Sequence, residues 1–234
     1  MRVAVALILV VLAVAGTACG GGGGSDTLAA KRTIDPAAQH QAESINLKLS
    51  DFPDGWRAST PSSEDEANQA KTRKCLGVDY SKLTLIGEAS SKDFAQGENA
   101  TASSEAQITK TEDQAKQGLQ RFADGLAGEK VTDCLRKAIG STPGYKVGEI
   151  EVGELKTAKP SEVDEARAWE IVVPVEVTSG PANGLSASVY SDLVYTRTGN
   201  VVAHVGTSDV LSPLDDALRR HLVRTVARRM SDAT

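Results

Sequence analysis

The sequence contains three histidines, whose side chains are the ones best suited to acid–base chemistry or metal binding near neutral pH. His40 and Glu43 have the spacing of two metal ligands on one helical turn, but a single pair needs further ligands. His204 lies in an apolar, strand-like stretch, which favours a hydrogen-bonded structural histidine over a general base. His221 is expected at the surface or partly buried. We therefore predict no metal site.

Acidic residues cluster at 64–66 and again at Glu149, Glu151 and Glu154. The first cluster is typical of the N-terminal turn of a helix, and the second of a strand face in contact with water. The sequence has no nucleophile elbow, Ser-x-x-Lys, phosphate-binding loop, dinucleotide glycine pattern or zinc Cys/His cluster. We therefore predict no catalytic residues, no cofactor and no enzyme activity. The least favoured alternative is a hydrolase built on His204 or on an acid pair.

The first cysteine lies at the end of an N-terminal export signal. After Arg2, the apolar run Val3–Ala15 is too short to span a membrane and ends in small residues, as secretory signals do. The segment Val14–Cys19 resembles a lipobox, in which small residues precede a cysteine whose thiol receives a diacylglycerol. We predict a signal peptide over 1–18 and a lipid on Cys19 that anchors the protein to the outer face of the cell membrane. The alternative is a secreted protein with a spare thiol at Cys19.

The other two cysteines, Cys75 and Cys134, form an even pair in a chain expected to reach an oxidising compartment. We predict that they form one disulfide, and the alternative is a pair of buried free thiols. In the chain-entropy account, closing the loop between them stabilises the fold by about 4 kcal/mol, as an upper figure.

A flexible tether is predicted between the lipid and the folded part of the chain. Gly20–Gly24 and the polar residues that follow have no apolar surface to bury. Counted as flexible chain up to residue 35, this segment reaches roughly 20 Å, which keeps the domain close to the membrane. Residues 19–35 are thus the predicted tether, and residues 36–234 form a single domain.

The charge of the exported chain argues against a nucleic-acid partner. Without Arg2, which leaves with the signal, the chain has 25 basic and 31 acidic residues and a net charge of −6 with neutral histidines. Nucleic-acid-binding domains typically carry a basic surface. Aromatic residues make up only 4% of the sequence, so the core must consist mainly of Val, Leu, Ile and Ala.

Start signals and apolar periodicity predict five helices. They are expected over 36–45, 64–75, 111–126 and 131–139, and from Ser212 onwards with Pro213 as the first helical residue. The last helix carries a stripe of arginines, namely Arg220, Arg224 and Arg228, joined by Arg219 and Arg229. A basic amphipathic helix can lie on anionic lipid. The favoured interpretation is a solvated face whose late arginines interact with the helix dipole.

Alternation of period two predicts five strands. They are expected over 100–109, 150–152, 169–177, 185–193 and 201–209, the first with small residues on a buried face that lets a helix lie close. Pro174 lacks an N–H group, so its strand should lie at an edge or carry a bulge. The predicted fold is therefore α+β. It is a twisted antiparallel sheet of about five strands with helices packed on it, in the order helices, one strand, two helices, four strands and a helix.

A turn is predicted over Asp51–Trp56, which contains Pro-Asp-Gly. Phe52 and Trp56 are expected to pin this turn onto the core, and the alternative is an exposed aromatic clamp for a ligand.

Three short motifs carry a resemblance to known proteins: Leu49–Trp56, Cys75–Gly77 and Asp133–Leu135. With the C-terminal strands and helix, they resemble the PknH-like extracellular sensor domain and LpqN-type lipoproteins of actinobacteria, the latter with a PsbP-like fold of a sheet and helices. Sensor domains of that type generally carry more than one disulfide around a cleft, whereas this chain offers one cysteine pair. The resemblance implies an exported domain with a fold of this kind and says little about a ligand.

Besides the least favoured hydrolase, two functions remain open at this point. The first is a non-catalytic ligand-binding or sensor-like module at the cell surface, with a small-molecule or envelope-derived ligand. The second is an envelope scaffold that docks another protein. A cleft of several hundred Å³ favours the first, whereas a flat apolar patch favours the second.

Overall fold

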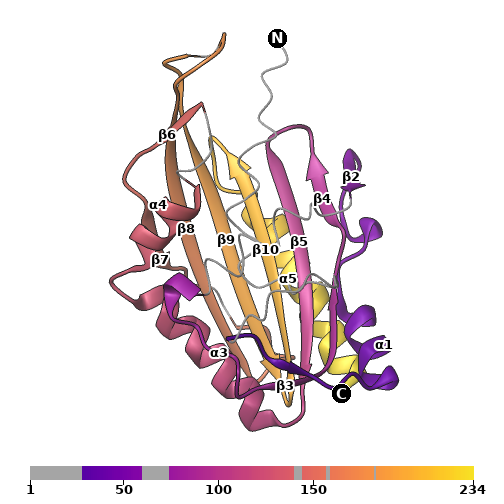
Figure 1. Ribbon diagram of the computed structural model, residues 1–234. Helices are drawn as coiled ribbons and strands as arrows, with labels where there is room; N and C mark the ends of the chain where they lie inside the picture. Colours follow the sequence, from indigo (N-terminus) through magenta and orange to yellow (C-terminus); the bar gives the residue numbers. More distant parts are fainter. Residues whose placement is uncertain (1–27, 60–73, 140–143, 157–158, 182) are drawn as a thin grey trace.

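The computed structural model describes residues 28–59, 74–139, 144–156, 159–181 and 183–234. Within these residues, ten strands form one sheet, and helices cover both of its faces (Figure 1). The strands are β1 (Lys31–Arg32), β2 (Trp56–Ser59), β3 (Thr84–Ser90), β4 (Asp93–Gln96), β5 (Ala100–Thr109), β6 (Tyr145–Val147), β7 (Glu151–Glu154), β8 (Glu165–Val177), β9 (Ser186–Thr198) and β10 (Val201–Val210). The helices are α1 (Pro36–Ile45), the 3-10 helix η2 (Leu49–Asp51), α3 (Glu112–Ala127), α4 (Val131–Ile139) and α5 (Asp216–Ala233).

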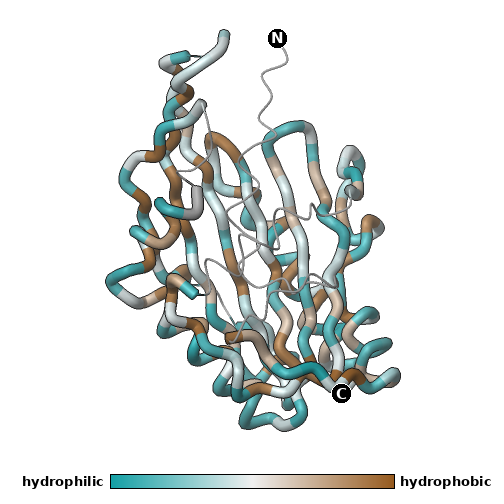
Figure 2. Tube along the Cα trace, in the orientation of Figure 1, coloured by the Kyte–Doolittle hydropathy of each residue, from teal (hydrophilic) through white to brown (hydrophobic). Residues whose placement is uncertain are grey.

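The order of the strands across the sheet is β1, β3, β5, β10, β9, β8, β6. β3 and β4 pair with successive parts of the same edge of β5, and β2 extends the sheet beyond β4. In the same way, β6 and β7 pair with successive parts of β8. The four long strands β5, β10, β9 and β8 pair antiparallel with their neighbours and form the centre. Figure 2 shows apolar segments recurring along these central strands.

Side chains of the central strands point alternately to the two faces of the sheet, so each face has its own hydrophobic core. Ile171 and Val173 of β8 point to the face covered by α3 and α4, and both are fully buried. Val194 of β9 and Val205 of β10 point to the opposite face, which α1 and α5 cover. The molecule therefore has three layers, with the sheet in the middle (Figure 1).

Small residues let α1 lie close to the sheet, as the sequence predicted. Ala102 and Ala106 of β5 are buried on that face. In β3, a Cβ atom added to Gly87 would lie 2.4 Å from the carbonyl oxygen of Ala38 in α1, so no larger residue fits there without moving the helix.

The predicted strand count was too low, since the sheet contains ten strands and not about five. The missed strands are β1, β2, β3, β4 and β6, most of them four residues or shorter, and such short edge strands show little alternation. The sheet is also mixed, because β1 pairs parallel with β3. β1 lies inside the stretch expected to be tether, so the sheet begins before Pro36.

Two further details of the prediction were wrong. The last helix begins at Asp216, and Asp215, not Ser212, caps it by accepting a hydrogen bond from the Leu218 N–H at 2.9 Å. Of the two alternatives for Pro174, the edge strand was wrong, because β8 pairs with β9 on one side and with β6 and β7 on the other, although the pairing on that second side is interrupted at Pro174. Pro174 is tolerated because it lies opposite the break between β6 and β7.

The turn before β2 packs on the core, as predicted. Trp56 is 5% exposed, and the ring of Phe52 lies 4.7 Å from that of Trp56 and 4.6 Å from that of Phe94. Gly55 has a φ of +95°, which the turn needs and which glycine adopts without strain. The three rings form one cluster, so the aromatic clamp is not supported.

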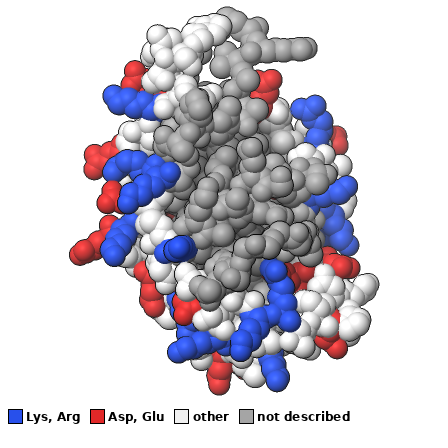
Figure 3. All heavy atoms as spheres, viewed as in Figure 1, with Lys and Arg blue, Asp and Glu red and all other residues white. Residues whose placement is uncertain are grey.

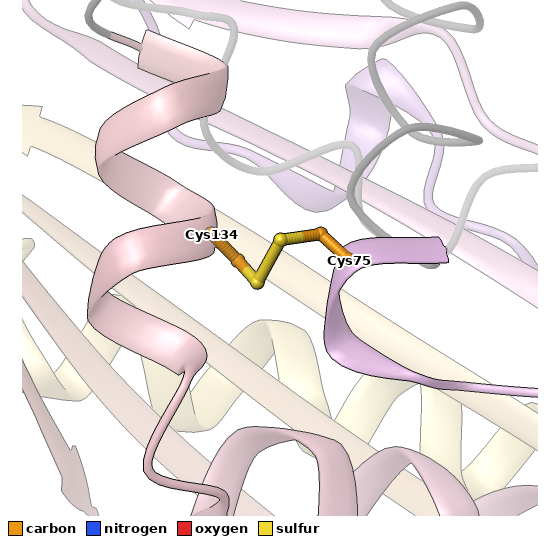
Figure 4. Close-up of a disulfide and its surroundings, with 2 residues drawn as sticks. All are labelled: Cys75 and Cys134. Atoms are coloured by element: carbon orange, nitrogen blue, oxygen red, sulfur yellow. A yellow bond between two sulfur atoms is a disulfide. The ribbon is translucent and has the colours of Figure 1, made fainter.

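Cys75 and Cys134 are joined in a disulfide with a Cα–Cα distance of 5.6 Å (Figure 4). Cys134 lies on α4, and Cys75 lies on a short helical turn, Lys74–Leu76. The rest of the helix predicted over 64–75 falls outside the described residues, as do the acids at 64–66. The bridge ties the chain that leads into β3 to the helix layer.

None of the helices that the structure describes is long and apolar enough to cross a membrane. Residues 1–27, which contain the predicted signal and Cys19, lie outside the described part of the chain.

Candidate functional site

The arginines of α5 fall into two groups that the sequence did not distinguish. Arg229 binds both carboxylate oxygens of Asp51, each at 2.8 Å, and donates to the Asn46 carbonyl at 2.7 Å. Arg219 binds Asp192 of β9 at 2.7 Å. These two arginines therefore hold α5 to η2 and to the sheet and do not belong to a solvated stripe.

The second group, Arg220, Arg224 and Arg228, is exposed. Arg220 forms an ion pair with Asp216 one turn earlier in α5. For Arg224 and Arg228, the described residues provide no ion-pair partner. Exposed guanidinium groups with free donors can bind carboxylates and phosphates in a bidentate manner.

A groove of about 420 Å³ runs beside this second group. One wall is α5, the other is the segment that precedes β8, and the sheet contributes Val194. The lining residues are Lys159, Pro160, Ser161, Glu162, Val194, Arg219, Arg220, Val223 and Arg224. This volume lies within the usual range for small-molecule sites.

The wall opposite α5 is fixed by contacts at its base. Val163 is 3% exposed, and Lys159 donates to its carbonyl oxygen at 2.7 Å. The Asp164 carboxylate accepts hydrogen bonds from the Gly199 N–H at 2.9 Å and from Arg197 at 3.1 Å. The hydrogen bond from the Gly199 backbone is the main reason why the pKa of Asp164 lies below its ordinary value. The groove is therefore bounded on both sides by anchored elements.

The groove carries a surplus of one positive charge. Four cationic side chains line it, and three carboxylates oppose them: Glu162 in the lining, and Asp192 and Asp216 as ion-pair partners. Burial acts to lower the pKa of Arg219, but its hydrogen bonds and ion pairs with Asp192 and Asp216 outweigh this and raise the pKa above its ordinary value. Arg219 thus stays charged, and a singly charged anion would balance the groove.

Below Arg219, the sheet holds two unusual polar groups. Asp192 is 3% exposed and lies opposite Thr207, which is 2% exposed, in the register of β9 and β10. Asp192 Oδ1 and Thr207 Oγ1 have no hydrogen-bond partner among the described residues. The charge of Asp192 is therefore compensated mainly through its other oxygen, by Arg219.

A second, much smaller cavity lies on the other face of the sheet, under α3. It measures about 30 Å³ and is lined by His204, Glu105, Tyr195 and Phe122, among others. Glu105 is 2% exposed and lies directly opposite His204 in the register of β5 and β10. The space suits a few water molecules and is too small for an organic ligand.

His204 is buried beside this cavity and packs against an aromatic ring. It is 7% exposed, and its ring stacks on Tyr195 with the centroids 5.0 Å apart. Desolvation by burial lowers the pKa of His204 to about 4, so the imidazole is neutral at pH 7.

This pKa predicts a loss of stability in mild acid. The unfolded chain has a histidine pKa of about 6.5 and therefore binds the proton more tightly than the folded state does. The free energy of unfolding should fall by about 3 kcal/mol between pH 6.5 and pH 4 because of this residue. Urea denaturation of the wild type and of His204→Phe across this range would test it, since the variant keeps an aromatic ring and cannot titrate. Parallel pH profiles for the two proteins would contradict this account.

The other candidate residues are not brought together. His40, Glu43 and His221 are exposed, as are Glu149, Glu151 and Glu154. Among the described residues, no three potential metal ligands lie close enough to hold an ion. The groove was missed because Lys159 and Val194, which line it, lie far from α5 in the sequence, and no periodic pattern marks them.

No protein-family model matches the sequence, and no curated protein is significantly similar to it. The extracellular domain of PknH from Mycobacterium tuberculosis aligns with a TM-score of 0.41 and 12% identity, over 86% of this chain and 98% of that domain. An uncharacterised protein of Mycobacterium smegmatis, an Rv0999 ortholog, aligns with a TM-score of 0.37 and 11% identity, over 78% of this chain and 92% of its own. The likeness to LpqN-type lipoproteins stays a prediction.

Proposed function

We propose that this chain is a non-catalytic binding module of the bacterial cell envelope that holds an anionic group in the groove between α5 and residues 159–162. The observation that carries the proposal is the groove itself, which combines about 420 Å³ of space with four cationic side chains. Arg224 is the central residue, because its guanidinium group has no ion-pair partner among the described residues and lines the groove.

The charge and lining of the groove indicate which anions fit. One surplus positive charge suits a carboxylate or a phosphodiester better than a polyphosphate. Val194 and Val223 add apolar surface to the lining. The ligand expected from this chemistry has one negative charge and an apolar part.

A binding role fits the chemistry of the groove better than a catalytic one. The residues that line it include no histidine or cysteine. His204, the buried candidate base, lies on the opposite face of the sheet and is neutral at pH 7 because of its lowered pKa. The two lining groups that could transfer a proton, Lys159 and Glu162, form hydrogen bonds with the Val163 carbonyl and with Ser161, so what the described groove mainly offers is charge for recognition.

The proposed location is outside the cytoplasm. The signal-like segment over 1–18, the lipobox-like residues before Cys19 and the Cys75–Cys134 disulfide support this together. In this proposal the lipid on Cys19 holds the domain on the outer face of the cell membrane, facing envelope ligands.

Removing the charge of Arg224 should weaken anion binding at the groove. Dimethyl phosphate and acetate serve as singly charged probes in an NMR titration of the purified full chain. Because a charged hydrogen bond contributes about 1.5–3 kcal/mol, Arg224→Gln should raise the Kd of dimethyl phosphate about tenfold or more.

The matched control is Arg136→Gln, which removes an exposed arginine from α4 on the other side of the sheet and should leave the Kd unchanged. Equal binding by the wild type and Arg224→Gln, or no binding by the wild type, would overturn the proposed function.

A second function, docking of an envelope protein, is favoured by one observation. Leu211 is 67% exposed and has a φ of +85°, which is strained for a residue other than glycine. Leu185 is 59% exposed, and Ser188, three residues further on, accepts a hydrogen bond from the Leu211 N–H at 2.8 Å. Crosslinking on intact cells that captures a partner in the wild type and loses it in Leu211→Gly would favour this function.

A further inference from the structure

We infer that the exposed arginine face of α5 docks on an anionic phospholipid bilayer, with the phosphodiester of one headgroup in the groove. This inference rests on the proposed function, because it names the source of the anion. The proposed occupant is the surface of the bilayer. A lipid headgroup brings the same chemical group to the groove as a free ligand would, namely a singly charged phosphodiester.

The arginine face is a row along one side of the helix that is inclined to the helix axis. Arg220, Arg224 and Arg228 follow one another every fourth residue, so the row is about 12 Å long at 1.5 Å per residue. Leu222, Val226 and Met230 on the opposite side are buried against the sheet. The packing of α5 therefore presents the arginine row away from the core.

Arg228 distinguishes a surface from a small ligand. It belongs to the row but not to the lining of the groove, so a free anion in the groove does not need it. A bilayer presents phosphodiesters side by side, which can reach Arg224 in the groove and Arg228 one turn further at the same time. Because the row of arginines continues beyond the groove, an extended anionic surface can contact more of the row than a small ligand can.

The acids around the row limit how strong this contact can be. Asp216 pairs with Arg220, Glu162 lines the groove, and Asp232 lies one turn beyond Arg228 and is exposed. Together with Lys159, the three arginines of the row outnumber these three acids by one charge. The whole chain, in contrast, carries a net charge of −5. The row is thus a local exception on an acidic protein. Such a patch orients a domain that another anchor already holds at the membrane.

The test uses the full chain with Cys19→Ser, which removes the proposed lipid attachment. Partitioning is measured on vesicles of phosphatidylcholine alone and on vesicles with half phosphatidylglycerol, at low salt. Because each arginine near an anionic surface contributes roughly fivefold, Arg228→Gln should lower the preference for phosphatidylglycerol about fivefold without changing the Kd of dimethyl phosphate. Arg224→Gln should lower this preference and raise the Kd of dimethyl phosphate, whereas Arg136→Gln should change neither.

Vesicles of phosphatidylcholine alone control for partitioning of the apolar N-terminal segment. If dimethyl phosphate binds but the wild type shows no preference for phosphatidylglycerol, the lipid inference is overturned and the proposed function stands. An Arg228→Gln variant with unchanged preference would overturn it as well. If neither probe binds, both proposals fail.

Discussion

Replacing Arg219 with methionine should lower the free energy of unfolding by about 3–5 kcal/mol. The substitution keeps most of the side-chain volume and removes the charge that compensates Asp192. That carboxylate is 3% exposed, and its Oδ1 already has no hydrogen-bond partner among the described residues. Without Arg219, an uncompensated charge would lie between the sheet and α5. Urea denaturation at pH 7 measures the change.

Two variants make this prediction sharper. Arg220→Met removes a neighbouring arginine whose side chain is 53% exposed, and it should cost less than about 1 kcal/mol. The double variant Arg219→Met, Asp192→Leu removes both charges and should recover most of the lost stability, because no buried charge is then left unpaired. If the double variant is no more stable than Arg219→Met, the loss comes from packing and not from the ion pair.

Breaking the disulfide should destabilise the fold by up to about 4 kcal/mol. The bridge closes a loop with a sequence separation of 59 residues and so restricts the unfolded chain strongly. It also attaches the turn before β3 to α4, whose Cys134 is 3% exposed. Cys75→Ala with Cys134→Ala removes the bridge and both thiols, and the shift of the urea midpoint measures its contribution.

Reductant provides the complementary measurement for the bridge. It should shift the midpoint of the wild type toward that of the double variant and leave the double variant unchanged. Cys19→Ala is the matched control and should not change the midpoint. A wild-type midpoint that does not respond to reductant under denaturing conditions would contradict the predicted contribution.

The sequence identified the elements that have strong local signals. In the helix predicted over 111–126, Thr111 caps α3 by accepting a hydrogen bond from the Gln114 N–H, and apolar residues such as Ala115 and Leu126 are buried. β5, β8, β9 and β10 were found from their alternation of period two. Each of these signals lies within about ten to fifteen residues, so it can be seen without knowledge of the partner element.

Short strands were not found in this way. β1 and β6 contain two and three residues, and β2 and β4 contain four. Such strands exist because a neighbour offers unpaired backbone groups, as β3 does for β1 and β5 for β4. The information that makes them strands lies in the neighbour and not in their own residues.

The arginines of α5 likewise show one feature that the local sequence reveals and another that depends on distant residues. Their spacing identified a basic helix, but Arg219 and Arg229 had the same pattern as the exposed arginines. Their partners, Asp192 and Asp51, lie 27 and 178 residues away in the chain. Which arginines are buried depends on where α5 crosses the sheet, and helical periodicity alone does not contain that information.

By itself, the sequence determined the helices with clear caps, the four long strands, the pairing of two cysteines and the expectation of an exported, lipid-anchored chain. Those conclusions depend on patterns of neighbouring residues or on simple counting. The tertiary structure decided the ten-strand order, the division of the arginines, the neutral state of His204 and the groove beside α5. These four features depend on burial and on contacts between segments that are distant in the sequence. Such contacts arise only when the layers pack, and packing excludes water from one side chain while the next stays exposed.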